Sequence, residues 1–220
     1  MRLFALIEGT EYQVLRGSVD VEVRGIRYDS RQVRPGDLFV CIRGFRRDGH
    51  DFLQAAWTAG AVAALMERSD LPENALQGGT VVRVANARKD LAMVACRFYG
   101  HPSQKLTMVG VTGTNGKTTT TYLVESVLRR AGHQVGLIGT IEYRCNGAEM
   151  EAARTTPESS DLQALLERMA LLSADSIVME VSSHALALHR WQQRLNEWAR
   201  KRPMPMSARQ RDLRRVHQAP

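Results

Sequence analysis

A glycine-punctuated turn between a predicted strand and a predicted helix carries the clearest chemical signal in the chain. Segment 109–120 reads VGVTGTNGKTTT, and the residues from 119 to 130 favour a helix. Glycines let backbone N–H groups converge on phosphate oxygens, and the helix N-terminus adds its positive dipole end. Lys117 can reach the β- and γ-phosphates, and the Thr118 hydroxyl can ligate Mg²⁺. Although Val111 replaces the first glycine of the strict pattern, this order of elements predicts a nucleoside-triphosphate site.

A second polar segment, Met179-Glu-Val-Ser-Ser-His184, ends a predicted buried strand. In open parallel sheets, ligands bind at the carboxyl ends of the strands. Glu180 would then face the same edge as the glycine-rich loop and could complete a Mg²⁺ shell with Thr118. The alternative is that Glu180 only caps or pairs near the following helix. Because the loop belongs to the same predicted domain, we favour metal ligation.

The composition is that of an ordinary globular protein, with 44% apolar and 24% charged residues. No apolar run approaches the length of a membrane span, and the N-terminus lacks a signal-peptide pattern. Cys41, Cys96 and Cys145 are scattered and have no metal-binding spacing, which predicts reduced thiols. We therefore expect a cytoplasmic protein that does not contact a membrane.

The net charge of +7 is concentrated in the last thirty residues. Residues 191–220 hold eight basic and two acidic side chains, so the preceding 190 residues are almost neutral. The tail has few apolar residues, and we expect disorder beyond residue 203. Arg-rich tails can bind polyanions, which leaves a nucleotide-binding module with a polyanion-binding tail as an alternative function. A tail without interleaved aromatic residues is usually only solvated, so we expect no nucleic-acid partner.

Strand and helix signals alternate along the first 190 residues, which predicts an α/β protein with a mostly parallel sheet. A turn near Asn146-Gly147 suggests a hairpin. The turn-rich stretch 100–103 suggests a domain boundary. We expect domains at 1–100 and 104–190, followed by the tail 191–220. The predicted strands are 21–28, 37–42, 61–66, 80–84, 107–112, 134–138 and 176–181, and the predicted helices are 52–61, 87–99, 119–130 and 160–172.

Together these segments resemble the UDP-N-acetylmuramoyl-tripeptide synthetases of the Mur ligase family, from near the start to about residue 190. The glycine-rich loop alone would also fit a folylpolyglutamate synthetase, which remains an alternative. The segments after it narrow the resemblance. The motifs are Asp29-Ser30-Arg31, Pro35-Gly-Asp-Leu-Phe-Val40, Asp48-Gly-His-Asp-Phe52, Gly113-Thr-Asn-Gly-Lys-Thr-Thr119, Thr155-Thr-Pro-Glu158 and Glu180-Val-Ser-Ser-His-Ala-Leu186.

The resemblance implies an ATP- and Mg²⁺-dependent ligase of peptidoglycan synthesis. Its acceptor would be UDP-MurNAc-L-Ala-D-Glu, whose carboxylate is phosphorylated before the amine of meso-diaminopimelate or L-lysine attacks. A small N-terminal α/β domain would bind the UDP-sugar, and a P-loop domain would bind ATP. Ser30 would contact the UDP part, and Thr155, Thr156, Ser182 and Arg190 would hold the acceptor. The resemblance also implies ATP binding by Gly113, Thr114, Asn115, Gly116, Lys117, Thr118 and Thr119, Mg²⁺ near Thr118 and Glu180, and catalytic roles for Lys117 and Glu180.

The chain departs from the family in two places. Phe45-Arg46-Arg47 stands where the family often presents a His-Gln-Ala-like turn to the uridine. The later part of the central domain, with its Asp-His-Leu-Asp segment, and a third domain do not follow residue 190. We hypothesise a truncated, inactive member whose last thirty residues come from a shifted reading frame or a misjoined gene. The Thr155-Thr156-Pro157 segment could also be a helix cap alone, with Pro157 in the first turn.

Overall fold

The computed structural model describes residues 1–44, 47–68, 70–150, 155–183 and 185. The chain divides into two compact units, Met1–Phe98 and a second that begins at Tyr99. Gly100 and His101 follow the division with φ values of 67° and 57°, and the short helix α4 (Pro102–Lys105) begins directly after them. Proline at the first helical position explains why a stretch that looks like a plain turn starts a helix here. Among the described residues, no helix is both long and apolar enough to cross a bilayer.

The first unit is built on a five-stranded sheet with the order β1-β5-β4-β3-β2. The sequence predicts all of its strands except β1, and β2 is shorter than expected. The strands are β1 (Tyr12–Arg16), β2 (Gly25–Arg27), β3 (Asp37–Val40), β4 (Ala63–Met66) and β5 (Thr80–Val84), and the helices are α1 (Leu3–Leu6), α2 (Leu53–Thr58) and α3 (Ala87–Phe98). Short 3₁₀ turns lie at Ser30–Gln32, Gly49–Phe52 and Glu73–Leu76.

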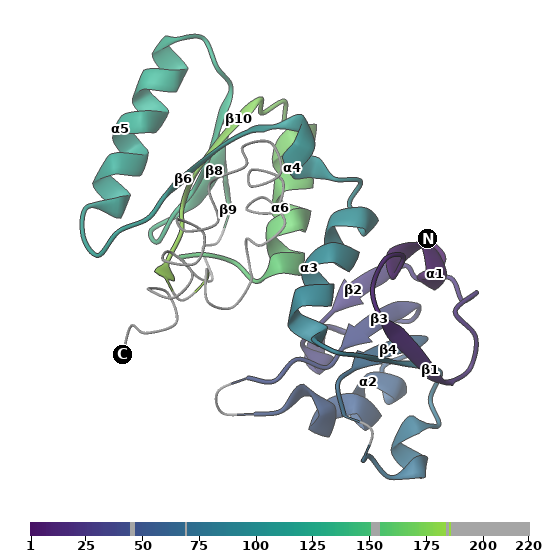
Figure 1. The fold of residues 1–220 in the computed structure, drawn as a ribbon. Helices are drawn as coiled ribbons and strands as arrows, with labels where there is room; N and C mark the ends of the chain where they lie inside the picture. The colour runs from purple at the N-terminus through teal and green to yellow at the C-terminus, as the bar shows by residue number, and fades with distance from the viewer. Residues whose placement is uncertain (45–46, 69, 151–154, 184, 186–220) are drawn as a thin grey trace, which may run out of the picture. The chain divides into compact units, whose positions relative to one another are not determined.

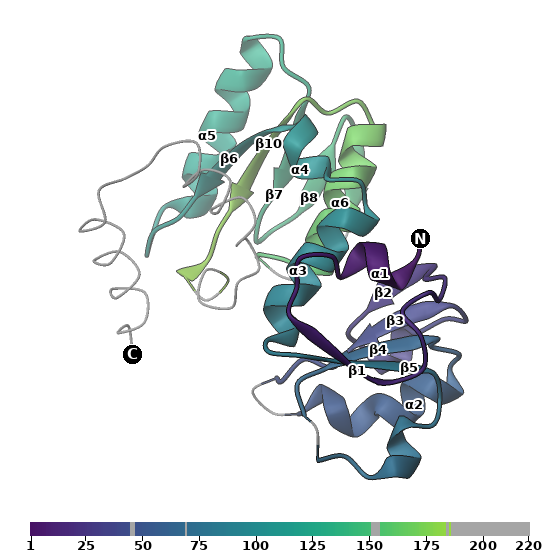
Figure 2. The same cartoon turned by 45° about the vertical axis from the view of Figure 1, so that its right-hand side comes forward.

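Strands β2 to β5 pair in parallel, and β1 adds an antiparallel edge. Most of β1 is exposed to solvent, so it lacks the apolar alternation by which a strand is predicted. Helix α2 covers one face of the sheet, where Trp57 packs near Phe39 and Met66. Helices α1 and α3 cover the other face (Figure 2). The first unit is therefore a three-layer α/β/α structure.

The second unit has a five-stranded sheet with the order β6-β10-β7-β8-β9. The three strands β6, β10 and β7 are parallel, and the β8–β9 hairpin continues the sheet in antiparallel fashion. Asn146 and Gly147 turn this hairpin with φ values of 46° and 82°, the signs that a type I′ turn requires. The elements are β6 (Thr107–Val111), α5 (Lys117–Arg130), β7 (Val135–Ile138), β8 (Tyr143–Cys145), β9 (Ala148–Met150), α6 (Ser159–Leu171) and β10 (Ser176–Glu180).

Alternating residues of the central strand β10 face the two helical layers of this unit. Ile177 and Met179 belong to the core beneath α6, while Val178 belongs to the core beneath α5. Figure 1 shows α5 on one face of the sheet and α6 with α4 on the other. A strand buried on both faces reads as a continuous apolar run, which is why the sequence predicts β10 well.

Ion pairs between the buried Glu125 carboxylate and two partly exposed arginines fasten α5 to the hairpin. Glu125 is 4% exposed and accepts hydrogen bonds from Arg129 at 2.9 Å and from Arg144 of β8 at 2.5 Å. Arg129 also donates to the carbonyl of Val135 at 2.8 Å, so the helix is tied to β7 as well. Removing one partner of such a pair leaves a buried charge, so these ion pairs fix the position of α5.

Helix α6 provides a matched test of the core of the second unit. Leu166 is 1% exposed and Leu171 is 80% exposed. We expect Leu166→Ala to lower the free energy of unfolding by about 2–5 kcal/mol, because it leaves a cavity. Leu171→Ala should change it by less than about 0.5 kcal/mol. Urea denaturation followed by circular dichroism measures both, and equal effects would contradict this account of the core.

Candidate functional site

The loop between β6 and α5 adopts backbone conformations that favour glycine at two positions. Gly113 has a φ of 153°, and Gly116 has a φ of 76° immediately before α5. A side chain at Gly116 would meet no atom within 4 Å, so its conformation, and not lack of space, requires glycine there. Helix α5 begins at Lys117, two residues earlier than predicted. Its first N–H groups have no carbonyl partners within the helix and are available to an anion.

The Lys117 side chain folds back over this loop. Its Nζ donates a hydrogen bond to the carbonyl of Gly113 at 2.9 Å and lies 3.5 Å from the carbonyl of Thr114. The ammonium group is therefore held beside the backbone N–H groups at the start of α5. A positive charge and several N–H donors at one place form a site for a polyanion such as a phosphate chain.

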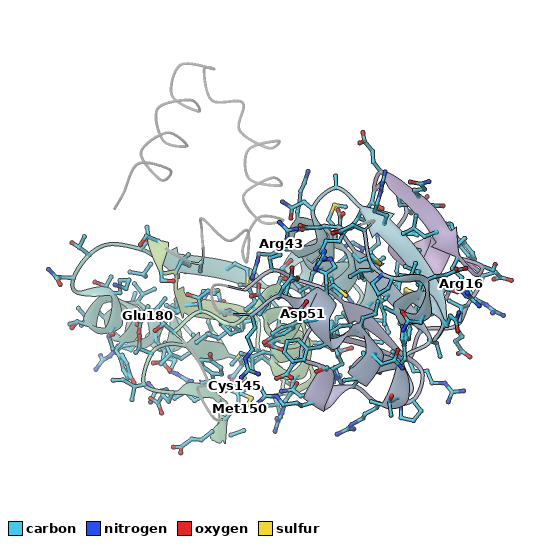
Figure 3. All side chains as sticks on the ribbon, turned by 90° about the horizontal axis from the view of Figure 1, so that it is seen from below. Arg16, Arg43, Asp51, Cys145, Met150 and Glu180 are labelled. Atoms are coloured by element: carbon cyan, nitrogen blue, oxygen red, sulfur yellow. The ribbon has the colours of Figure 1, made fainter. Side chains whose placement is uncertain are left out.

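Glu180 ends β10 at the same edge of the sheet. It pairs in register with Val111, the last residue of β6, and its side chain is labelled in Figure 3. It is 1% exposed, and within the described part of the chain its carboxylate takes part in no ion pair. Oε1 of Glu180 accepts the Thr118 hydroxyl at 3.0 Å. The sequence predicted this pairing of loop and strand end from the sheet topology alone.

The donors around Glu180 suit a hard cation. A carboxylate and a hydroxyl oxygen lie side by side at the start of α5, and Mg²⁺ prefers oxygen ligands. The described residues contain no group of three or more His, Cys, Asp or Glu side chains that could hold a metal by themselves. This arrangement fits Mg²⁺, which usually takes one or two protein ligands and completes its shell with water and substrate phosphates.

A pocket of about 430 Å³ opens between the loop and the strand ends. It brings together the predicted nucleotide-binding and acceptor-binding residues of this unit, with the exception of Gly113, Thr156 and Arg190, the last of which lies outside the described residues. Thr140 is the one lining residue that the sequence analysis did not single out. The lining consists of Thr114, Asn115, Gly116, Lys117, Thr118, Thr119, Thr140, Thr155, Glu180 and Ser182.

The Thr155-Thr156 segment lies against the end of β10. Thr156 is 2% exposed; its hydroxyl donates to the Glu180 carbonyl at 3.0 Å and accepts from the Ser182 N–H at 3.1 Å. Thr156 therefore holds the backbone on both sides of Val181. The Ser182 hydroxyl accepts from the Ala185 N–H at 3.1 Å. The hydroxyls of Thr155, Thr156 and Ser182 all make hydrogen bonds within the chain, and Thr155 and Ser182 also line the pocket.

Segment 155–158 agrees only in part with the alternative that it serves as a helix cap alone. Helix α6 begins at Ser159, and the side chain of Glu158 caps it. Pro157 therefore precedes the helix instead of standing in its first turn. The segment does more than start a helix, because Thr155 and Thr156 reach the strand end beside it.

Two predicted site residues lie elsewhere. Ser30 belongs to the first unit, where it begins the 3₁₀ turn that follows β2, and Asp29 caps this turn. It thus sits at the carboxyl end of a parallel strand, as a ligand-binding residue of this fold would. Arg190 lies outside the described residues, as does the tail 191–220.

The first unit holds a buried histidine, His50, which belongs to the motif at residues 48–52 and to which the sequence analysis assigned no role. His50 is 2% exposed, and its Nε2 accepts the N–H groups of Glu67 at 3.0 Å and Arg68 at 3.4 Å. Its Nδ1 therefore carries the proton and donates to Asp48 at 2.5 Å. Partial burial raises the pKa of Asp48, but hydrogen bonds from His50 outweigh this and hold the pKa below its ordinary value. The pair ties the chain after β3 to the end of β4.

Comparison with known families agrees with this geometry. The model of the Mur ligase middle domain matches residues 111–197, and that of the Mur ligase family catalytic domain matches residues 22–99. The chain belongs to the Mur ligase family. Together the two matches include both the glycine-rich loop of the second unit and the strand ends of the first unit.

Curated Mur ligases from several bacteria are similar over 190 residues, or 86% of the chain. Those from Clostridium tetani, Alkaliphilus metalliredigens and Alkaliphilus oremlandii are 41%, 45% and 47% identical. Each is named UDP-N-acetylmuramoyl-L-alanyl-D-glutamate--2,6-diaminopimelate ligase. The match covers 38–39% of their lengths, so this chain spans well under half of the relatives it resembles.

Solved Mur ligase structures share the fold. A ligase of the same name superposes with a TM-score of 0.62 at 23% identity, covering 76% of this chain and 34% of the other. A MurF structure from Acinetobacter baumannii superposes with a TM-score of 0.55 at 23% identity, covering 82% and 35%. The mixed α/β class with mostly parallel sheets, predicted from the sequence, is confirmed.

The hydroxyl of Thr156 provides a test of how the site is held together. We expect Thr156→Val to lower the free energy of unfolding by about 1–3 kcal/mol, because it leaves the Ser182 N–H without its acceptor. Thr156→Ser keeps the oxygen and should recover most of this loss. Thermal and urea unfolding of the two variants check the prediction. A Val variant as stable as the parent chain would show that this bridge contributes nothing.

Proposed function

We propose that this chain provides the UDP-sugar-binding and ATP-binding parts of a ligase that adds 2,6-diaminopimelate to UDP-MurNAc-L-Ala-D-Glu. The observation that carries the proposal is the meeting of Lys117, Thr118 and the buried Glu180 carboxylate at one sheet edge. The names of the curated relatives supply the substrates. The reaction belongs to peptidoglycan synthesis, and we place it in the cytoplasm, where ATP and nucleotide sugars are available.

The proposed reaction has two steps. First, an oxygen of the D-glutamate carboxylate attacks the γ-phosphorus of ATP, which gives an acyl phosphate and ADP. The free amine of diaminopimelate then attacks the acyl carbon. Inorganic phosphate leaves with the electrons of the broken C–O bond, and the nitrogen loses a proton as the amide forms. Phosphoryl transfer of this kind depends mainly on positioning and on neutralising charge, which are the tasks this site suits.

The glycine-rich loop and the residues around it would position the phosphates of ATP and neutralise their charge. The N–H groups at the start of α5 and Lys117 would bind the β- and γ-phosphates. Thr118 and Glu180 would hold Mg²⁺, and the ion would neutralise phosphate charge when bound. A bound ion would also compensate for the burial of the Glu180 carboxylate, which takes part in no ion pair within the described part of the chain.

The remaining predicted residues would hold the acceptor. Thr155 and Ser182 border the same pocket as the glycine-rich loop, so an acceptor held by them would present its carboxylate close to the γ-phosphate. Thr156 would act chiefly by fixing the backbone that carries them. Ser30 would contact the UDP part in the first unit, and Arg190 would contact the acceptor.

We assign no described residue to the amino-acid substrate. The curated relatives that are named for diaminopimelate extend well beyond the matched region.

Lys117 provides the direct test of nucleotide binding. We expect Lys117→Ala to weaken binding of Mg²⁺ and a non-hydrolysable ATP analogue roughly 10- to 100-fold, because charge-assisted hydrogen bonds to phosphate are lost. Lys105→Ala, an exposed lysine outside the pocket, is the matched control and should leave binding unchanged. Isothermal titration calorimetry of the full chain measures both. Equal affinities for the two variants would contradict a phosphate site at this loop.

Glu180→Gln distinguishes the proposed role of Glu180 in binding Mg²⁺ from its role in the stability of the fold. The amide keeps the shape of the side chain but removes a buried charge, so the free energy of unfolding should not fall. Binding of the ATP analogue should lose its dependence on Mg²⁺, because the carboxylate ligand is gone. Titrations with and without Mg²⁺, together with a urea denaturation curve, check both parts. Undiminished Mg²⁺ dependence would remove Glu180 from the metal site.

A further inference from the structure

Thr140 lies where the chain leaves β7, at the carboxyl edge beside the end of β10. Ile138, the last residue of β7, pairs with Met179, so Gly139 and Thr140 follow β7 beside Glu180. The Gly139 N–H donates to the Glu142 carbonyl at 3.1 Å and turns the chain toward β8. Neither residue belongs to a motif that the sequence analysis used. Both nevertheless contact the buried carboxylate.

Thr140 holds both oxygens of the Glu180 carboxylate. Its backbone N–H donates to Oε1 at 3.0 Å, and its hydroxyl donates to Oε2 at 3.0 Å. The final torsion of a glutamate side chain is broad and not fixed by rotamer preference. Two donors from one residue, one to each oxygen, therefore set the plane of the carboxylate.

Gly139 closes the same side of Glu180. A Cβ atom at this position would lie 3.0 Å from Oε1, which is tighter than ordinary contact. The backbone can approach the carboxylate only because this residue is glycine. With Thr140 and Gly139 on one side, Oε1 is left directed toward the Thr118 hydroxyl.

The Thr140 hydroxyl also reaches the acceptor side of the pocket. Its oxygen lies 3.1 Å from the hydroxyl oxygen of Thr155. A hydroxyl has one proton, and Thr140 gives its proton to the carboxylate, so it accepts from Thr155. A continuous chain of hydrogen bonds therefore runs from Thr155 through Thr140 and Glu180 to Thr118.

We propose that Thr140 is a positioning residue that orients the Glu180 carboxylate toward the metal and links it to Thr155. This inference rests on the proposed function for the identity of the metal and the acceptor. Its consequence is that the Thr140 hydroxyl strengthens Mg²⁺-dependent nucleotide binding without touching nucleotide.

Three variants test the proposal by calorimetric titration of the full chain with a non-hydrolysable ATP analogue, with and without Mg²⁺. Thr140→Val should weaken Mg²⁺-dependent binding roughly 5- to 10-fold, since one hydrogen bond to the carboxylate is lost. Binding without Mg²⁺ should not change, and a purely structural defect would weaken both. Thr140→Ser should bind within about twofold of the parent, because one hydrogen bond is worth little more than a kcal/mol and here it is kept. Thr107→Val, at the opposite edge of the sheet, is the control.

A thermal double-mutant cycle tests the contact without any ligand. Thr140→Val should lower the melting temperature by about 4–8 °C in the parent chain, because an oxygen of a buried carboxylate loses its donor. The loss should be much smaller in the Glu180→Gln background, where no charge remains to be held. Equal losses in both backgrounds would overturn the proposal.

The two experiments separate the possible failures. If the parent chain binds no nucleotide, the proposed function fails, and the melting cycle still decides whether Thr140 positions Glu180. If the parent chain binds with Mg²⁺ dependence and Thr140→Val keeps that dependence in full, the positioning role is wrong and the proposed function stands.

Discussion

The second unit depends on a buried carboxylate that is held by hydrogen bonds alone among the described residues. Removing an ionised group from water costs several kcal/mol unless hydrogen bonds or charges compensate for it. Glu180 receives its compensation from two hydroxyls and one backbone N–H, which come from two other segments of the chain, those of Thr118 and Thr140. These segments must therefore meet at one point for the unit to be stable. The geometry of the site and the stability of the fold therefore both depend on the hydrogen bonds to the Glu180 carboxylate.

A parallel sheet is well suited to meet this requirement. Strands β6, β10 and β7 run in the same direction, so their carboxyl ends deliver the glycine-rich loop, Glu180 and Thr140 to a single edge. The two faces of the sheet are filled by α5 and α6, so polar groups gather at its edge. The first unit follows the same logic, since Ser30 and the Asp48–His50 pair lie after the ends of β2 and β3. Arg43 precedes the Asp48–His50 pair in the sequence and Asp51 follows it; both side chains are labelled in Figure 3.

Much of this arrangement could be predicted from local sequence. The Gly116-Lys117-Thr118 turn has few other uses, and the apolar run before Glu180 allows only a buried strand. Thr140 could not be found in this way, because a lone threonine after a strand is common and its role depends on a strand 40 residues later. His50 was hidden for the same reason, since its partners at Glu67 and Arg68 come from another strand end. Strand β1 was missed because it is exposed at the sheet edge, where burial does not impose alternation.

The direction of the hydrogen bonds from Thr155 through Thr140 to Glu180 determines which ligand groups this part of the pocket can bind. When the Thr140 hydroxyl donates its one proton to Glu180, Thr155 donates to Thr140, and the lone pairs of Thr155 are left for a ligand in the pocket. That point of the wall complements an N–H or O–H group and repels a bare carboxylate oxygen. A peptide amide would be accepted there, whereas an anion would be turned toward Lys117 and the start of α5. The orientation of a substrate bearing both groups would thus be set by polarity before any bond is made.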